Sequence, residues 1–201
     1  MADLILTEAL DRALPQTQCR QCGFRGCREY AAAMAEDSAP LNRCPPGGEA
    51  GIRKLAAILR REPLPLDPEY GHEMPFAVAR IRPNECIGCG RCARICPVDA
   101  VIGSRRRLHA VIADACTGCA LCESACPLGC IDMTETGRGW GEKEALAARE
   151  RFERRERRSE RARREAEAMY LALGQNDESK KKATIEALLA LAKARAARPK
   201  A

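Results

Sequence analysis

Apolar side chains recur at helical spacing in three stretches near the start of the chain. Residues 3–14 carry leucine and alanine along one face and are followed by Pro15. Residues 28–37 are rich in alanine and stop before Pro40, and residues 49–61 are apolar every three to four positions. Each stretch predicts a short helix. The inward-facing positions are Leu6, Leu10, Ala13 and Leu14 in the first helix, and Ile52, Leu55, Ala56 and Leu59 in the third.

Short extended segments replace the helical pattern after residues 63–75, a stretch with four prolines that predicts a stiff, non-helical linker. Residues 76–81 predict a strand, and residues 108–112 predict its counterpart thirty positions later. Residues 98–102 and 128–133 follow two cysteine-rich loops in the same corresponding way. This internal repeat predicts a pseudo-two-fold α+β domain with one cysteine loop in each half.

The last third of the chain is highly charged. Residues 143–173 predict a helix, residues 174–177 a break, and residues 181–195 a second helix. Arginine and glutamate pair there at spacings of three and four, as on a solvated helix face. Residues 141–201 hold 17 Lys and Arg against 11 Asp and Glu, while residues 1–140 hold 17 of each, so the net charge of +6 lies wholly in this tail.

Eight of the 13 cysteines repeat one spacing, C-x2-C-x2-C-x3-C followed by proline. One copy runs from Cys86 to Pro97 and the other from Cys116 to Pro127. The doubled spacing is typical of bacterial ferredoxins with two [4Fe–4S] clusters, in which the fourth cysteine of each loop binds the other loop's cluster. Two sites are therefore predicted. Site 2 comprises Cys86, Cys89, Cys92 and Cys126, and site 3 comprises Cys116, Cys119, Cys122 and Cys96.

Other uses of these cysteines fit less well. Structural zinc uses paired knuckles with a longer spacer, and disulfides need an oxidising compartment. The chain begins Met1-Ala-Asp-Leu without a signal peptide, which favours a reducing cytoplasm. No P-loop, dinucleotide fingerprint or acid/base pair is recognisable. The sequence thus predicts an electron carrier without substrate chemistry of its own.

A third set, site 1, consists of Cys19, Cys22, Cys27 and Cys44, with the spacing C-x2-C-x4-C-x16-C. Four thiolates suit either Zn²⁺ or a third [4Fe–4S] cluster. The predicted helix from residue 28 would direct N–H groups at the site, which favours the more negative occupant. Three residues are given plain roles: Cys130 as a small buried side chain against the second cluster, His72 as a solvated loop residue, and His109 as a packing or surface residue.

The run from Cys19 to Ala31 followed by Cys44-Pro-Pro-Gly-Gly48 resembles the N-terminal iron–sulfur module in the B subunit of Rnf-type (Rsx-type) electron-transport complexes. The segment Cys126-Pro-Leu-Gly-Cys130-Ile-Asp-Met133 is similar to the same family, and the resemblance covers about residues 7–135. It implies that site 1 holds a third [4Fe–4S] cluster, with zinc as the less favoured occupant. Most members begin with an apolar membrane anchor, so we expect a short form without one.

The pattern of elements and motifs along the chain predicts four parts. They are an N-terminal helical [4Fe–4S] module at 1–62, a proline-rich linker at 63–75, a ferredoxin-like domain with two clusters at 76–135, and a basic helical tail at 136–201. Because aromatic residues make up only 3% of the chain, we expect small modules that depend on metal for folding. No apolar run approaches the ~20 residues of a membrane span.

The expected partners are redox proteins: a ferredoxin or NADH-linked reductase and the other subunits of an Rnf/Rsx-type, redox-driven translocase. The basic tail and Arg105-Arg106-Arg107 would attract acidic partners, and the expected location is cytoplasmic, with peripheral contact to the inner face of the plasma membrane. Two alternatives stay open: a redox-responsive interaction or nucleic-acid-binding protein, and an iron–sulfur subunit of another oxidoreductase. Aromatic residues are nearly absent from the tail, which argues against nucleic acid.

Overall fold

The computed structural model describes residues 3–196. Contacts within the chain group it into two compact units, Met1–Arg155 and Glu156–Ala201. All three cysteine sets lie in the first unit. The four-part division expected from the sequence stays a prediction.

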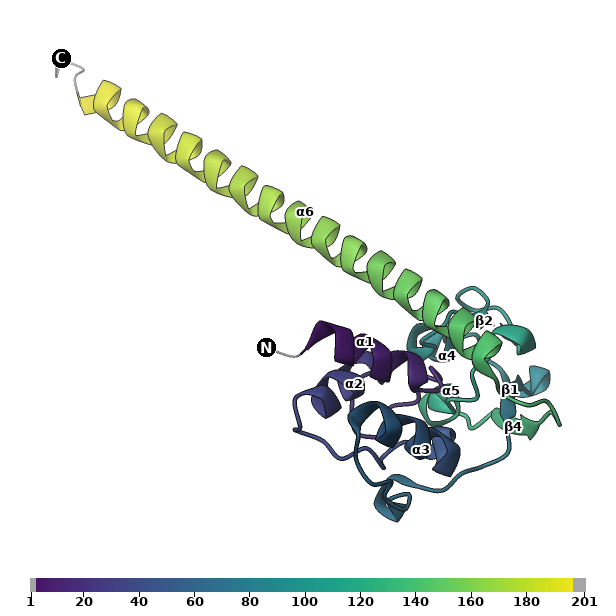
Figure 1. Ribbon diagram of the computed structural model, residues 1–201. Helices are drawn as coiled ribbons and strands as arrows, with labels where there is room; N and C mark the ends of the chain where they lie inside the picture. The colour runs from purple at the N-terminus through teal and green to yellow at the C-terminus, as the bar shows by residue number, and fades with distance from the viewer. Residues whose placement is uncertain (1–2, 197–201) are drawn as a thin grey trace. The chain divides into compact units, whose positions relative to one another are not determined.

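Three helices form the N-terminal part of the first unit (Figure 1). They are α1 (Leu4–Ala13), α2 (Cys27–Ala35) and α3 (Gly48–Leu59), close to the predicted ranges. The Asp3 carboxylate caps α1 by accepting from the N–H groups of Ile5 and Leu6. Because the apolar faces converge, a small core forms between them. Its most buried members are Leu10, Tyr30, Ala31, Met34 and Leu55.

The proline-rich connection is held against the helices. The Asn42 side chain donates to the Pro65 carbonyl at 2.8 Å, and the Asp67 N–H donates to the Asn42 carbonyl at 3.0 Å. A short 3₁₀ turn, Pro68–Tyr70, interrupts the stretch that was predicted to be free of helix. Proline suits the first position of such a turn because its missing N–H has no partner to lose there.

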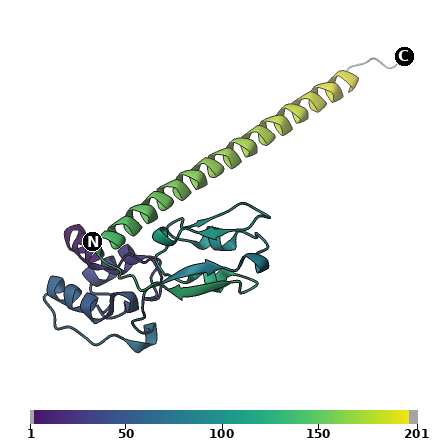
Figure 2. The same ribbon diagram turned by 90° about the vertical axis from the view of Figure 1, so that its right-hand side faces the viewer.

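Two small antiparallel sheets follow (Figure 2). Strand β1 (Ala77–Ile81) pairs with β4 (Ile131–Glu135), and β2 (Val101–Ile102) pairs with β3 (Ala110–Val111). Strands β1 and β2 belong to the first half of the repeat, and β3 and β4 belong to the second. Exchanging the two halves therefore maps the β1–β4 pair onto the β3–β2 pair. The strands have the predicted order, and β2 and β3 are shorter than predicted.

Each half also contributes a short helix directly after its first cysteines. Helix α4 (Arg91–Ile95) carries Cys92, and α5 (Leu121–Ala125) carries Cys122. Both helices end at the cysteine that precedes proline, because the residue before proline is disfavoured in helical conformation.

A 55-residue helix, α6 (Glu142–Ala196), ends the described chain. The predicted break at residues 174–177 is wrong. A glycine inside a helix costs only about 1 kcal/mol relative to alanine, which does not force the helix to end. The start of α6 belongs to the first unit, where Ala145 and Ala148 are buried. Within residues 3–196, no helix has a stretch apolar and long enough to cross a bilayer.

Candidate iron–sulfur sites

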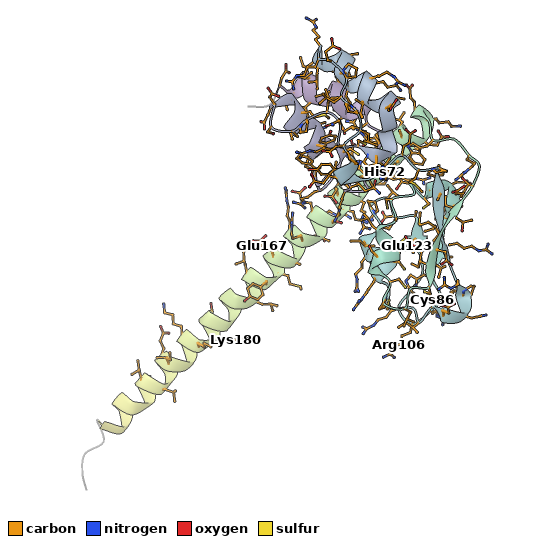
Figure 3. The ribbon with its side chains drawn as sticks, turned by 90° about the horizontal axis from the view of Figure 1, so that it is seen from below. His72, Cys86, Arg106, Glu123, Glu167 and Lys180 are labelled. Carbon is orange, nitrogen blue, oxygen red and sulfur yellow. The ribbon has the colours of Figure 1, made fainter. Side chains whose placement is uncertain are left out.

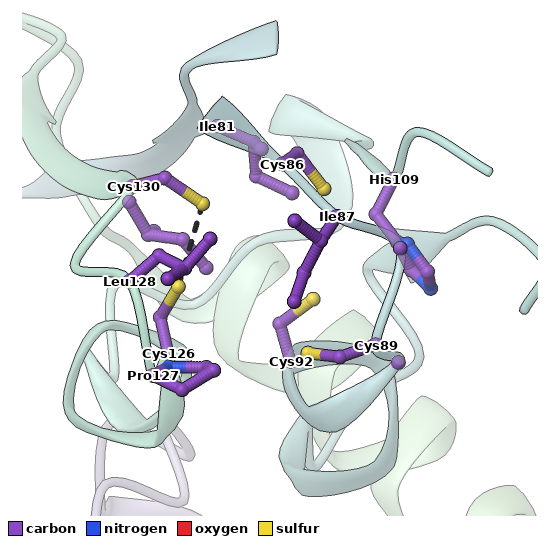
Figure 4. A pocket seen from close by; sticks show the side chains of 13 residues that line it. Ile81, Cys86, Ile87, Cys89, Cys92, His109, Cys126, Pro127, Leu128 and Cys130 are labelled. Atoms are coloured by element: carbon purple, nitrogen blue, oxygen red, sulfur yellow. Dashed lines mark hydrogen bonds between the residues drawn. The ribbon is translucent and has the colours of Figure 1, made fainter. Parts of the chain in front are cut away.

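The four cysteines assigned to site 2 surround one cavity of about 330 Å³. Cys86, Cys89 and Cys92 approach from the first loop and α4, and Cys126 approaches from the other half of the repeat (Figure 4). The remaining wall is largely apolar and includes Ile81, Ile131 and Leu128. A dry cavity with four sulfur atoms around it suits a cluster whose own charge is balanced by the surrounding dipoles.

Glycine is required in the loop that carries these cysteines. Gly88 has φ of +68°, and a Cβ there would lie 2.5 Å from backbone atoms of Arg107. Its carbonyl accepts from the Arg106 N–H at 2.9 Å, so the residue 105–107 turn lies directly on the cysteine loop. Gly118 is the counterpart in the second loop, with φ of +69°, and a Cβ there would lie 2.6 Å from the Ala77 carbonyl oxygen. Any side chain at either position would push the loop away from its support.

The site 3 cysteines line a second cavity of about 310 Å³. Cys116, Cys119 and Cys122 come from the second loop and α5, and Cys96 comes from the first half. Three of these four residues are buried and Cys119 is half-buried. The Ala100 N–H donates to the Cys96 sulfur at 3.2 Å, which is a bond to a prospective ligand atom.

Site 1 gathers Cys19, Cys22, Cys27 and Cys44 at the edge of the three-helix core. Cys22, Cys27 and Cys44 are buried and Cys19 is half-buried. The four lie close enough for their charges to act on one another, since the Cys44 thiol is influenced by Cys19 and Cys22, and the Cys27 thiol by Cys44 and Cys19. The structure thus gathers the site 2 and site 3 cysteines around one cavity each, and the assignment of the three ligand sets stays a prediction.

Buried polar side chains hold the loops of site 1. The Gln18 carbonyl oxygen accepts from the Cys27 N–H at 3.0 Å, and the Gln18 amide donates to Gln16 at 2.8 Å. The Tyr30 hydroxyl donates to the Pro40 carbonyl and accepts from the Arg43 N–H, which fixes the segment before Cys44. Sequence analysis missed these residues because a glutamine in a loop looks like any solvated residue.

The surroundings of Arg43 indicate which kind of metal group site 1 can bind. Within the described part of the chain, its buried Nε has no hydrogen-bond partner. Its positive charge acts to lower the pKa of the Cys22 thiol, although burial raises that pKa more strongly. An unpartnered buried guanidinium nitrogen whose positive charge acts on the Cys22 thiol fits an anionic metal–thiolate group, which would supply the missing acceptor.

Burial raises the pKa of six site thiols, which are Cys22, Cys27, Cys44, Cys92, Cys119 and Cys122. It raises the pKa of Cys44 and Cys122 to about 12 and that of Cys119 to about 11. The Cys126 thiol differs: burial acts to raise its pKa, but backbone N–H groups and the Cys130 thiol outweigh burial and lower it. A cysteine that binds a metal must be a thiolate. Metal binding by the thiols with a raised pKa therefore has to displace protons.

Direct hydrogen bonds join site 3 to site 1. The Thr117 hydroxyl, next to Cys116, donates to the Thr17 carbonyl at 2.8 Å, and Thr17 lies two residues before Cys19. Thr17 and Thr117 are 5% and 2% exposed, so this junction is dry. Trp140 adds a second link, because its indole N–H donates to the Pro15 carbonyl at 2.7 Å while its ring packs on Phe76.

An ion cluster ties the start of α6 to α1. Arg149 donates to the Glu8 carboxylate at 2.8 Å and lies 3.2 Å from Asp11. The side chains of Arg149 and Asp11 are 14% and 3% exposed. The hydrogen bond from Arg149 is the main reason that the pKa of Glu8 falls to about 2. This cluster is structural: it ties α6 to α1, and α1 packs against α2, which begins at Cys27 of site 1.

The residues given plain roles lie as follows. His72 is exposed, in the proline-rich connection and far from site 2 (Figure 3). His109 is buried and its ring forms part of the site 2 cavity, a position the sequence did not reveal. Cys130 is also buried in the wall of site 2. Neither His109 nor Cys130 belongs to a predicted ligand set.

Site 2 is the most accessible of the three. Cys89 is exposed, and Ile87 and Leu128 beside it are 63% and 49% exposed. Arg105, Arg106 and Arg107, here called the arginine patch, are exposed next to the same loop. Figure 3 shows Arg106 and Cys86 at the same end of the first unit. Within residues 3–196, no carboxylate forms an ion pair with the patch.

Comparison with known families defines the class of protein. A family model described as "4Fe-4S dicluster domain" matches residues 79–133, which contain sites 2 and 3. A second, described as "Putative Fe-S cluster", matches residues 14–46, which contain site 1. The chain is therefore an iron–sulfur protein with a ferredoxin-type domain that binds [4Fe–4S] clusters.

Curated relatives define the family. The chain is 54% identical over 145 residues to the B subunit of the ion-translocating oxidoreductase complex of Stutzerimonas stutzeri, covering 71% of this chain and 75% of that protein. It is 57% identical over 131 residues to the protein of the same name from Pseudomonas aeruginosa, covering 65% and 68%. The chain belongs to this family, the B subunits of Rnf-type complexes, as the resemblance implied.

Coverage differs among the relatives. The matches to the corresponding proteins of Azoarcus sp. and Thiobacillus denitrificans span 58% of each of those proteins and are 53% and 54% identical. Family membership does not favour the nucleic-acid-binding alternative or the subunit of an unrelated oxidoreductase.

Proposed function

We propose that the protein relays single electrons through three [4Fe–4S] sites, as the B-type subunit of an Rnf-like electron-transport complex. The observation that carries this proposal is the dry junction between Thr117 and Thr17, which joins site 3 directly to site 1. Sites 2 and 3 are joined by the crossed cysteines Cys96 and Cys126. The three sites therefore form a continuous series, from the accessible site 2 through site 3 to site 1.

The proposed ligands are the three cysteine sets. Cys19, Cys22, Cys27 and Cys44 hold the first cluster; Cys86, Cys89, Cys92 and Cys126 hold the second; Cys116, Cys119, Cys122 and Cys96 hold the third. A bound [4Fe–4S] cluster supplies reversible one-electron chemistry at a potential set by its surroundings.

The chain's own contribution is positional and electrostatic. The walls of sites 2 and 3 are largely apolar, and a low local dielectric strengthens the effect of nearby dipoles. The Ala100 N–H and the Arg43 side chain supply positive partners for sulfur at sites 3 and 1. No proton or substrate bond has to move, so rigid loops serve this function better than mobile ones.

The arginine patch is the proposed docking surface for an acidic redox partner, a ferredoxin or an NADH-linked reductase. Its backbone contacts the cysteine loop of site 2 at Gly88, and the exposed Ile87 and Leu128 line the same site. An apolar centre with a charged rim is typical of transient protein interfaces, where the charges mainly speed encounter. The other subunits of the complex would then receive electrons from the site 1 end, with the chain peripheral on the cytoplasmic face of the plasma membrane.

Charge reversal at the patch tests this function. We expect Arg105→Glu/Arg106→Glu/Arg107→Glu to slow electron transfer from a reduced acidic ferredoxin by roughly tenfold or more at low salt, because electrostatic steering accelerates association by about 10–10³. Anaerobic stopped-flow bleaching of the cluster absorbance measures the rate, and the difference should shrink as salt is added.

The control variant is Arg161→Glu/Arg163→Glu/Arg164→Glu, which makes the same change in net charge on α6 outside the first unit. Equal slowing in both variants would show that net charge matters and the patch does not. Loaded protein that cannot be reduced by any one-electron donor would refute the relay itself.

A further inference from the structure

Cys130 contacts a proposed ligand without belonging to a ligand set. Its sulfur lies 3.4 Å from the Cys126 sulfur, within hydrogen-bonding distance for a thiol, and its side chain is 4% exposed (Figure 4). The wall around it consists of apolar side chains such as Ile81, Leu128 and Ile131. Either sulfur can be the donor in this contact, and the protonation state of Cys126 decides which one donates.

The internal repeat supplies a comparison within the same molecule. Cys96-Pro-Val-Asp-Ala100 in the first half corresponds to Cys126-Pro-Leu-Gly-Cys130 in the second. The backbone N–H of Ala100 donates to the Cys96 sulfur at 3.2 Å, and backbone N–H groups of Leu128, Gly129 and Cys130 act to lower the pKa of Cys126. The side chains at the corresponding positions differ, because Ala100 carries a methyl group and Cys130 a thiol.

We infer that Cys130 donates an S–H···S hydrogen bond to the Cys126 sulfur when that sulfur is a cluster ligand, and thereby raises the reduction potential of site 2. The inference rests on the proposed function, because it requires Cys126 to be a ligand. A cysteine that binds a cluster is a thiolate, and its sulfur can only accept a hydrogen bond. The neutral Cys130 thiol is then the donor. A hydrogen bond to a ligand sulfur stabilises the more negative, reduced state, and this raises the potential.

Cys130 therefore makes the two halves of the repeat differ in how they act on the reduction potential of a bound cluster. Cys130 is a positioning residue that acts on site 2 through Cys126, and site 3, with Ala100 in its place, lacks this donor.

An EPR-monitored redox titration of the anaerobic, cluster-loaded protein tests the inference. Three proteins are compared: the wild type, Cys130→Ala, which makes the second half match the first, and Cys130→Ser, which keeps a hydrogen-bond donor. We expect Cys130→Ala to shift one midpoint potential to a more negative value, with the others unchanged and iron content equal to the wild type. Cys130→Ser should restore the wild-type potential or exceed it.

Three results would overturn the inference. Unchanged potentials in fully loaded Cys130→Ala would show that the thiol does not act on the site. Equal shifts in the Ala and Ser variants would assign the effect to packing rather than to hydrogen bonding. Loss of about four iron atoms in both variants would make Cys130 a ligand. A wild type without iron would instead refute the proposed function, so the two failures are distinguishable.

Discussion

Removing iron is expected to unfold the first unit of the protein. Its apolar cores are small: the sheets have two strands each, and β2 and β3 are two residues long. Two-stranded sheets are at best marginally stable alone. Eight of the thirteen cysteines are buried and form part of these cores, so the sulfur atoms occupy positions that larger apolar side chains would fill in an ordinary domain.

The expected size of this effect follows from the energy of metal binding. Structural metal sites in small modules contribute on the order of 10 kcal/mol, which is comparable to the whole stability of about 5–15 kcal/mol for a typical domain. Anaerobic treatment with an iron chelator should therefore abolish the dispersed amide signals of residues 3–155 in an NMR spectrum. Reconstitution with iron and sulfide should restore them. Retention of the dispersed spectrum without iron would contradict this account of folding.

Replacement of Arg149 has the second-largest expected effect. Arg149→Met keeps the length of the side chain but removes the nearest cationic partner of the buried Asp11 carboxylate, which keeps only Arg28 at 4.0 Å and the Gln16 amide, while Glu8 keeps Arg12 and Arg28. Breaking a buried ion pair from one side typically costs about 3 kcal/mol or more. We expect a loss of roughly 3 kcal/mol in the free energy of unfolding, measured by denaturant titration of the anaerobic, loaded protein.

The matched control is Arg161→Met. Arg161 pairs with Glu165 at 3.7 Å, but both side chains are more than 70% exposed, and such helical pairs contribute only about 0.3–0.5 kcal/mol. The folded-state pKa of Glu8 lies below its unfolded value of 4.5, so its stabilising contribution is present above that pH and is lost as pH falls toward 2. The Arg149→Met effect should thus be steady near neutral pH. Equal, small losses in both variants would show that the ion cluster contributes little.

Local chemistry made the three sites predictable from the sequence. Metal ligation fixes the spacing of cysteines within a loop, and Cys-Pro turns recur in both halves, so the sets could be assigned before their positions were known. Helices α1, α2 and α3 could be predicted equally well, because the sequence marks each of them with apolar or alanine-rich positions.

The contacts between the N-terminal helices and the ferredoxin-type part were not predictable in this way. Thr117 and Thr17 are one hundred residues apart in the sequence, Trp140 and Pro15 are still farther apart, and neither pair has a local signature. Arg149 lies in a charged helix where most arginines are exposed. Nothing in the sequence around it sets its buried side chain apart from the exposed ones. A signal was present: Ala145, Ala148 and Phe152 form an apolar stripe at helical spacing, which marks the start of α6 as packed.

The most direct test of the central claim is metal analysis of anaerobically purified protein, combined with EPR of the dithionite-reduced sample. The account predicts about twelve iron atoms per chain, no zinc, and interacting S = 1/2 signals from three reduced [4Fe–4S] sites. About eight iron atoms with one zinc would contradict the three-site relay by removing site 1, and a protein that stays free of iron after reconstitution would contradict the account as a whole.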